Sequence, residues 1–235
     1  MTTILLTGTS RGIGAAAMTM LQECGAKVIG QSTRGGEGVL MADFSQPGAA
    51  EQLWRAAVEA AGGAIDILIN NAGAFVANPL TQDDGDWVGG WAEGLQVNLT
   101  SAAILSRLAV QHWLERGAEG RLVHIASRAG HRGDSPDHWH YAAAKGGMLA
   151  MHKTIARGYG AKGITSFAIA PGFVDTAMAD DYLATRGGAG ILQDIPIGRV
   201  ATPDEIARII TFCALDAPAS MTGATLDANG ASYVR

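Results

Sequence analysis

The sequence is poor in cysteine, in aromatic residues and in charge, and these shortages exclude several classes of protein. Cys24 and Cys213 are the only cysteines among 235 residues, and neither belongs to a metal-ligand spacing, so a disulfide scaffold and a zinc site are excluded. Seventeen basic residues against 22 acidic ones give a net charge of −5 with no basic run, which argues against a surface that follows phosphate backbones. We expect no metal and no nucleic-acid partner.

Long apolar runs are also missing. No stretch approaches the roughly 18 residues that cross a bilayer. The start, Met-Thr-Thr-Ile-Leu-Leu-Thr-Gly, has neither the basic region nor the apolar length of a signal peptide. We therefore expect a soluble, cytoplasmic protein with no membrane partner. The 48% of hydrophobic residues suffices for a core, and residues 1–235 are expected to form a single domain.

Short apolar runs alternate with helix-length stretches along the whole chain, and runs such as Ile-Leu-Leu are typical of parallel strands covered on both faces. The expected strands are Thr3–Thr7, Lys27–Gly30, Gly38–Met41, Ile65–Ile69, Arg121–Ala126, Thr165–Ala170 and Ala224–Asp227. The expected helices are Gly12–Cys24, Gln46–Ala61, Trp91–Arg116, Tyr141–Gly160 and Pro203–Leu215. This order predicts an α/β fold: a single Rossmann-type doubly wound parallel sheet of about seven strands with helices on both faces.

Two segments, residues 73–90 and 171–198, break the alternation. Both are rich in glycine and contain proline, which is typical of surface loops. Because long loops at strand ends often carry function, we expect both to border the active region. A tolerated insertion is the alternative for either segment.

Glycine is the one residue in clear excess, with 32 copies that follow no three-residue period and so exclude a collagen-like fibre. Three of them stand in Thr7-Gly8-Thr9-Ser10-Arg11-Gly12-Ile13-Gly14, between the first strand and the first helix. Gly8 permits a tight turn, Gly12 lets a pyrophosphate approach, and Gly14 lets the helix pack on the sheet. Backbone N–H groups and the helix dipole favour an anion here, so the turn predicts a dinucleotide site. A purely structural turn is the alternative.

The spacing Gly-x-x-x-Gly-x-Gly, with further motifs in order, resembles the classical branch of the short-chain dehydrogenase/reductase family. The further motifs are Asn70-Asn71-Ala72-Gly73, Val97-Asn98-Leu99, Ser127, Tyr141-Ala-Ala-Ala-Lys145 and Pro171-Gly172-Phe173-Val174-Asp175-Thr176. The resemblance covers essentially the whole chain. It departs from the family's pattern where Ser127 and Tyr141 lie one residue further apart than is usual.

Tyr141 and Lys145 carry chemistry that the residue types themselves suggest. At positions i and i+4 they share a helix face, so the ammonium can lie near the phenol. A phenol has a pKa of about 10, and a nearby cation favours its ionised form. Ser127 follows a parallel strand, where its hydroxyl can bond an oxygen that gains negative charge. An amphipathic helix with an exposed lysine is the alternative.

The resemblance implies hydride transfer between a nicotinamide ring and a carbonyl or carbinol carbon. Tyr141 would give or take the proton on oxygen, and Ser127 would orient that oxygen. Lys145 would bind the nicotinamide ribose, and Asn98 would hold a water in a relay to Lys145. The implied cofactor contacts are Gly8, Ser10, Arg11, Gly12, Ile13, Gly14, Ser32, Thr33, Arg34, Asp43, Phe44, Asn71, Ala72, Gly73, Tyr141, Lys145, Pro171, Gly172, Val174 and Thr176.

The end of the second strand indicates which nicotinamide cofactor is used. A site for NAD(H) usually places a carboxylate there to hold the ribose 2′-hydroxyl. Here the stretch is Gly30-Gln31-Ser32-Thr33-Arg34, without an acid. Arg11 and Arg34 can flank a 2′-phosphate, and Ser32 and Thr33 can donate to it. NADP(H) is therefore the expected cofactor, with NAD(H) and two solvated arginines as the alternative.

The loop Arg128–His140 contains His131, His138 and His140. Three histidines can suggest a metal, but their spacing across a proline-containing loop is no known ligand pattern. We expect them to be loop residues or part of the substrate wall, with His138 and Trp139 as substrate contacts.

Substrate and assembly are expectations from composition and resemblance. A homotetramer is expected, because Ala102, Ala103, Ala109, Ala150 and Ala156 allow close helix packing and the tail Asp227–Arg235 resembles family tails that cross a subunit contact. The expected substrate is a small free ketone or alcohol. The alternatives are 3-oxoacyl chains on an acidic carrier protein, the isomerase or dehydratase chemistry of the family's extended branch, and a non-enzymatic cofactor-binding scaffold.

Overall fold

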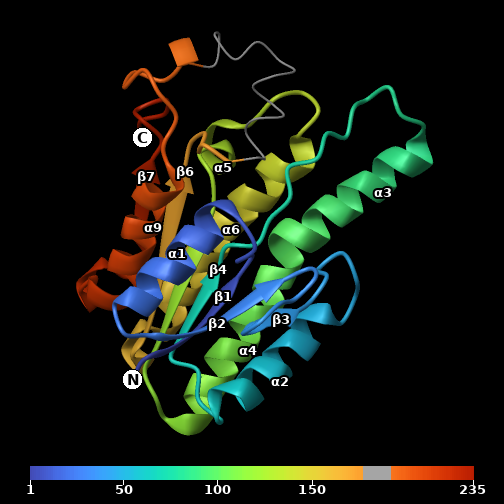
Figure 1. Ribbon diagram of the computed structural model, residues 1–235. Coiled ribbons are helices and arrows are strands. Elements are labelled where there is room, and N and C mark those ends of the chain that lie inside the picture. The colour runs from blue at the N-terminus through green and yellow to red at the C-terminus, as the bar shows by residue number, and fades with distance from the viewer. Residues whose placement is uncertain (177–191) are drawn as a thin grey trace.

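One parallel sheet is the frame of the molecule. The computed structural model describes residues 1–176 and 192–235. These residues form seven strands in the order β3-β2-β1-β4-β5-β6-β7, so the predicted fold class is confirmed (Figure 1). The strands are β1 (Thr3–Thr7), β2 (Lys27–Ser32), β3 (Val39–Met41), β4 (Ile67–Asn70), β5 (Gly120–Ile125), β6 (Ile164–Pro171) and β7 (Thr225–Ala228).

Helices cover both faces of the sheet (Figure 1). α1 (Gly12–Glu23) and α9 (Pro203–Thr211) pack on one face. α2 (Ala49–Ala61), α4 (Ser101–Arg116) and α6 (Trp139–Tyr159) cover the other. The remaining helical pieces are α3 (Asp84–Leu95), α5 (Ala129–Arg132), the π-helical segments Gln96–Thr100 and Phe212–Asp216, and the 3₁₀ turns Gly160–Lys162 and Ala219–Met221. Within the described ranges, no helix has the length and apolar character that a membrane crossing requires.

Alternate side chains of the central strands enter two separate cores. Ile4 and Leu6 of β1 pack on the α1 and α9 side, whereas Leu5, between them, packs on the α2 and α4 side. All three are fully buried. Because successive side chains of a strand point to opposite faces, a strand that is covered on both faces must be apolar throughout. This is why the strands appear in the sequence as continuous apolar runs.

The structure corrects three of the predicted helix starts, and the first of these is α2, which begins at Ala49 and not at Gln46. Residues 84–90, expected to belong to a loop, form the first part of α3, because the Asp83 carboxylate accepts a hydrogen bond from the Asp86 N–H and caps the helix. This part of the helix was not predicted, because α3 contains several glycines and glycine has a low helix propensity. α6 begins at Trp139, two residues before the expected start at Tyr141. Most of the second expected loop lies outside the described residues, and β6 reaches Pro171 at its beginning.

The alanines expected to face a neighbouring subunit are mostly used within the monomer. Ala102, Ala109 and Ala156 are buried, two of them inside the core clusters under α4 and α6. Ala150 is exposed and Ala103 is half-buried. The small-residue argument thus keeps only Ala103 and Ala150 as surface positions, and helix pairing between subunits stays a prediction.

The central strands β1 and β4 are parallel neighbours, but the connections that follow them run to opposite faces of the sheet. After β1 it enters α1 on one face, and after β4 it leads through α3 to α4 on the other. At such a switch point the connections part and leave a crevice at the carboxyl ends of the strands. The candidate site lies in this crevice.

Candidate active site

A cleft of about 820 Å³ follows the carboxyl ends of the strands from β2 to β6. Nearly all the residues predicted for the cofactor and for catalysis line it: the glycine turn, the end of β2, Asp43 and Phe44, the Asn71–Gly73 turn, Ser127, Tyr141, Lys145 and the Pro171–Thr176 loop. Arg34 and Asn98 are not among the lining residues. The structure thus brings together motifs that are spread over most of the sequence.

The turn after β1 can be built only with glycine. Gly8 has a φ of +74°, and a Cβ on it would lie 2.8 Å from the Cα of Ala72. A Cβ on Gly14 would overlap the carbonyl oxygen of Gly8. These close approaches let the turn lie directly against the end of β4 and let α1 start immediately beyond it.

The N-terminus of α1 faces the cleft in a form that suits an anion. Its N-cap residue is Arg11, and within this described helix the first turn carries no acid and the Arg11 side chain makes no capping hydrogen bond. Helix N-termini with free N–H groups favour phosphate. A Cβ on Gly12 would lie 3.0 Å from Cγ2 of Thr176, so the backbone there leaves a space that a side chain would fill. The residues present therefore fit a dinucleotide phosphate.

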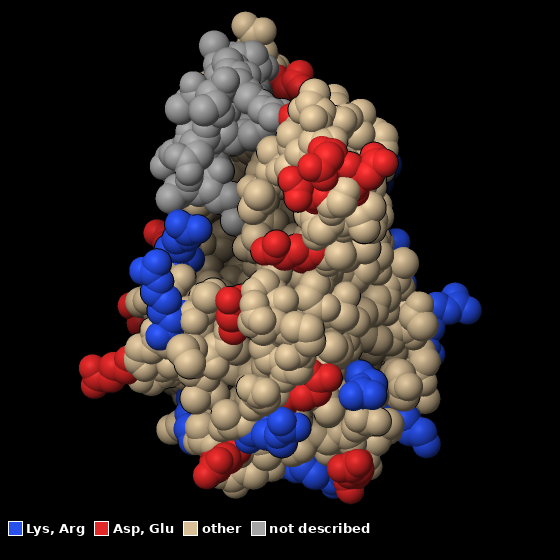
Figure 2. Space-filling model, turned by 90° about the vertical axis from the view of Figure 1, so that its right-hand side faces the viewer, with Lys and Arg blue, Asp and Glu red and all other residues tan. Residues whose placement is uncertain are grey.

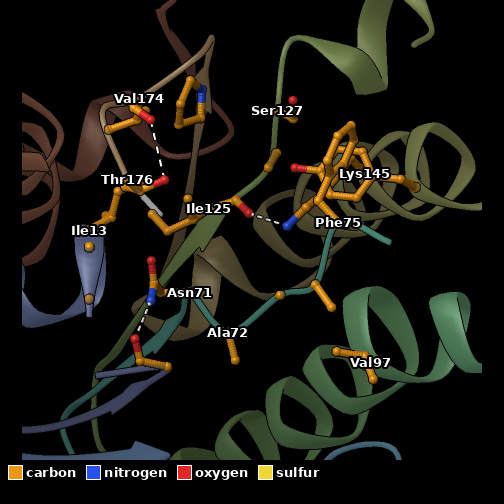
Figure 3. A pocket seen from close by; sticks show the side chains of 18 of the residues that line it. Ile13, Asn71, Ala72, Phe75, Val97, Ile125, Ser127, Lys145, Val174 and Thr176 are labelled. Atoms are coloured by element: carbon orange, nitrogen blue, oxygen red, sulfur yellow. Dashed lines mark hydrogen bonds between the residues drawn. The ribbon is translucent and has the colours of Figure 1, made fainter. Parts of the chain in front are cut away.

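Two side chains fasten the glycine turn to the end of β4. Nδ2 of Asn71 donates to the carbonyl oxygens of Thr7, at 2.8 Å, and Gly8, at 3.1 Å. The hydroxyl oxygen of Thr7 accepts the N–H groups of Asn71 and Ala72, both at 3.0 Å. Figure 3 shows Asn71 and Ala72 on the floor of the cleft. The Asn-Asn-Ala-Gly motif thus holds the backbone of the glycine turn against the end of β4.

Lys145 is buried, and its ammonium has a fixed partner. Its Nζ donates to the carbonyl oxygen of Ile125 at 2.8 Å, from α6 to the end of β5 (Figure 3). The lysine is only 3% exposed. Burial disfavours the charged form and lowers the pKa of Lys145 to about 8. The cleft therefore holds a cation that is close to its titration range at neutral pH.

Tyr141 lies one helical turn before Lys145, with the Lys145 Nζ 5.6 Å from its ring centroid. Burial raises the pKa of Tyr141 to about 12, and the hydrogen bond with Ser127 opposes this only in part. The expectation that the ammonium would bring the phenol pKa down was wrong for the protein by itself, because desolvation has the larger effect. At neutral pH the phenol keeps its proton and can act as a donor.

Asn98 acts on the rim of the site through the backbone. It lies in the π-helical segment Gln96–Thr100, and its Oδ1 accepts the N–H of Ala74 at 3.0 Å. Its Nδ2 donates to the carbonyl oxygens of Ala74 and Gly94, both at 3.0 Å. Asn98 therefore fixes the chain just after the Asn71–Gly73 turn. Its role in a water relay stays a prediction.

The predicted substrate contacts His138 and Trp139 do not line the cleft. His138 is buried and stacks on Phe75 with the ring centroids 3.8 Å apart. Trp139 is half exposed and meets Trp87 of α3 edge to face. Phe75, Asp134 and Ser135 line the cleft in their place. Phe75 also contacts the Tyr141 ring edge to face at 4.8 Å, so the histidine supports the wall from behind.

Arg34 is exposed at the turn after β2, beyond the lining residues, whereas Arg11, Ser32 and Thr33 line the cleft. In the ranges 1–176 and 192–235, no three His, Cys, Asp or Glu side chains gather as metal ligands would. Gln31, Phe75, Glu93 and Val97 line the cleft as well, although they were not among the predicted contacts. Glu93 and Val97 are one helical turn apart, a spacing that would have indicated a shared face.

Comparisons with known proteins agree with this geometry. The family model described as enoyl-(acyl carrier protein) reductase matches residues 8–230. The 3-oxoacyl-(acyl-carrier-protein) reductase FabG of Escherichia coli (strain K12) is 36% identical over 242 residues, covering 98% of this chain and 96% of the relative. The acetoacetyl-CoA reductase of Shinella zoogloeoides is 35% identical over 243 residues, covering 97% of both.

The chain belongs to the short-chain dehydrogenase/reductase family. A solved structure supports the same assignment: a protein from Agrobacterium tumefaciens, described as a 2-deoxy-D-gluconate 3-dehydrogenase with bound NADP, superposes with a TM-score of 0.87 at 29% identity. The match covers 100% of this chain and 97% of that one. As a short-chain dehydrogenase/reductase, the protein is an NAD(P)-dependent oxidoreductase.

The buried ammonium of Lys145 gives a prediction for stability. An unfolded lysine has a pKa of about 10.4, whereas the folded value is about 8. Folding therefore releases a proton between these values, and the cost of burying the charge is fully present below pH 8 and fades as the pH rises. We compare the free energies of unfolding of the wild type and of Lys145→Met. From pH 7 to pH 10, the value for the wild type should rise by about 2 kcal/mol relative to that of the variant.

Urea titrations of both proteins without cofactor measure this difference. Lys153→Met, at an exposed position of the same helix, is the matched control and should show no such trend. A gap between wild type and Lys145→Met that stays constant from pH 7 to pH 10 would mean that Lys145 titrates normally in the fold.

Proposed function

We propose that this short-chain dehydrogenase/reductase transfers a hydride between NADP(H) and a small ketone or secondary alcohol. One observation carries the proposal: Ser127, Tyr141 and Lys145 line the same cleft as the glycine turn and the N-terminus of α1. Proton chemistry and phosphate binding are thus available along one continuous surface.

Tyr141 is the proposed proton donor. Its pKa of about 12 keeps the phenol protonated at neutral pH, which suits donation to a carbonyl oxygen during reduction. Ser127 contacts the phenol and is the proposed partner of the same substrate oxygen, where it stabilises the negative charge that develops. Ser127 lies two residues after β5, where its Oγ accepts the N–H of Ala129, and Tyr141 lies in the first turn of α6.

Lys145 and Asn98 have supporting roles in the proposal. The Lys145 ammonium, anchored on the Ile125 carbonyl, would bind the nicotinamide ribose and supply positive charge beside the phenol once that phenol has lost its proton. Asn98 would hold the water that returns a proton towards Lys145. The carboxamide of Asn98 already bonds to Ala74 and Gly94. We therefore propose that Asn98 positions the water and does not contact the substrate.

The cofactor site is proposed to prefer the 2′-phosphate form. When bound, the nicotinamide ring supplies or accepts the hydride. Arg11, Ser32 and Thr33 line the adenosine end of the cleft, and β2 ends without a carboxylate. The proposed neighbours of the adenine and the carboxamide are Asp43 and Phe44 at one end and Val174 and Thr176 at the other. The structural relative from Agrobacterium tumefaciens carries NADP, which supports this choice.

A second candidate function is the reduction of 3-oxoacyl chains on a carrier, because the curated relatives include reductases of carrier-bound and CoA-bound substrates. Charge argues for the small substrate. The whole chain has a net charge of −5, although both acidic and basic side chains line the cleft and Figure 2 shows both signs beside the hollow. An acidic carrier protein would meet a molecule of like net charge, at a cost in encounter rate and affinity. Lys162 cannot serve a carrier at the cleft, because it lies just before β6, at the amino ends of the strands and at the far end of the sheet from the cleft.

Cytoplasmic location and a homotetramer remain proposals. The length and acidity of the chain are compatible with the first. The tail Asp227–Arg235 supports the second in part, since Ile197 and Val234 are strongly exposed apolar residues in its neighbourhood. Two-fold symmetric association would cover them.

Removal of the Tyr141 hydroxyl tests the proton donor. Tyr141→Phe should lower kcat/KM for carbonyl reduction by about 10²–10⁴-fold, because the ring and its contact with Phe75 survive while the transferable proton is lost. The dissociation constant of NADPH, measured by fluorescence titration, should change little. Tyr159→Phe at the exposed end of α6 is the control. Near-normal turnover of Tyr141→Phe would refute the assignment.

A comparison of substrates tests the proposed class. With NADPH in excess, the protein should reduce small ketones with a higher kcat/KM than acetoacetyl-carrier protein, because the net charge of −5 on the chain opposes the approach of an acidic carrier. Efficient reduction of the carrier-bound substrate, with small ketones inert, would select the second candidate.

A further inference from the structure

Gln31 is a buried amide at the end of β2 that the proposed mechanism does not use. We infer that Gln31 is a positioning residue of the cofactor site, which holds the glycine turn at a fixed distance from the segment bearing Asp43 and Phe44. The inference rests on the proposed function, since it concerns how the adenosine end of the cofactor is received. The side chain is only 2% exposed, yet the residue lines the cleft.

The carboxamide of Gln31 bridges two segments that are far apart in the chain. Its Oε1 accepts the N–H of Gly8 at 2.9 Å, and its Nε2 donates to the carbonyl oxygen of Ala42 at 2.7 Å. Gly8 begins the phosphate-facing turn, and Ala42 directly precedes Asp43 and Phe44 in the cleft wall. One side chain therefore links the two walls between which the adenosine would lie.

The main chain of Gln31 strengthens the same connection. Its carbonyl oxygen accepts the backbone N–H of Thr9 at 2.9 Å and the hydroxyl of Thr9 at 3.2 Å. Consecutive residues of the turn, Gly8 and Thr9, are thus both fastened to one residue of β2. Gly30 makes room for this, because a Cβ there would lie 2.8 Å from Oγ1 of Thr9.

Gln31 also completes a clamp on Gly8. Asn71 at the end of β4 donates to the carbonyl oxygen of Gly8, while Gln31 at the end of β2 accepts its N–H. β2 and β4 flank β1 in the sheet, so the two amides reach the turn from opposite sides. A turn with two glycines has high conformational entropy, and such a clamp fixes it before phosphate arrives.

The chemistry of the bridge requires glutamine. One end must accept from an N–H and the other must donate to a carbonyl oxygen, and a neutral carboxamide supplies both. A glutamate carboxylate keeps the acceptor but places a second acceptor against Ala42, and methionine keeps the shape but loses both bonds. Since buried groups left without a partner are costly, either change should loosen the turn.

The test uses adenosine 2′,5′-bisphosphate, a probe that covers only the adenosine end of NADP(H). Calorimetry should show Gln31→Met binding it about tenfold or more weakly than the wild type, because two buried hydrogen bonds are lost. The KM for NADPH should rise while kcat at saturating NADPH stays within about twofold, since Ser127 and Tyr141 lie on other elements. Gln52→Met, on the exposed side of α2, is the matched control.

Gln31→Glu gives a second, pH-dependent readout. A protonated carboxyl can donate to Ala42 and accept from Gly8, so the affinity of this variant relative to the wild type should recover as the pH falls from 8 to 5.5. If the folded variants bind the probe as the wild type does, Gln31 does not position the site. If the wild type itself fails to bind the probe, the proposed NADP(H) site is wrong, and this inference with it.

Discussion

The close approach of the glycine turn to the end of β4 is the constraint on which the rest of the site depends. Gly8 lies so near Ala72 that no side chain fits between them, and Asn71 and Thr7 fasten the two segments with four hydrogen bonds. This contact sits at the switch point of the sheet, where chains leaving β1 and β4 part. The crevice opens at this contact, and the first residues of α1 line it.

The chemical half of the cleft depends on desolvation. Tyr141 and Lys145 share one face of α6, and burial favours the uncharged form of both side chains. It therefore raises the pKa of the phenol and lowers the pKa of the ammonium. A buried cation is costly by itself, and the Ile125 carbonyl offsets only part of that cost. Such an arrangement is typical of residues retained for function, because an apolar pair would pack there more stably.

Much of the fold and site could be predicted because they depend on local signals. β1 and the turn after it follow directly from an apolar run and a fixed glycine spacing, and the Tyr141–Lys145 pair follows from helical periodicity. The sequence could not show what depends on tertiary packing. The Asp83 cap makes α3 start inside a glycine-rich segment, and His138 turns inward onto Phe75 rather than towards substrate. Gln31 gave no signal, because its two partners are 23 and 11 positions away.

The central claim is that this cleft receives NADP(H) and presents it to the proton donor Tyr141. The most direct measurement is the initial rate of reduction of a small ketone with NADPH and with NADH, followed as kcat/KM for each cofactor. The account predicts a clear preference for NADPH, because the end of β2 lacks a carboxylate while Arg11, Ser32 and Thr33 line the cleft. A ratio that favours NADH, or no oxidation of either cofactor across a panel of ketones, would contradict it.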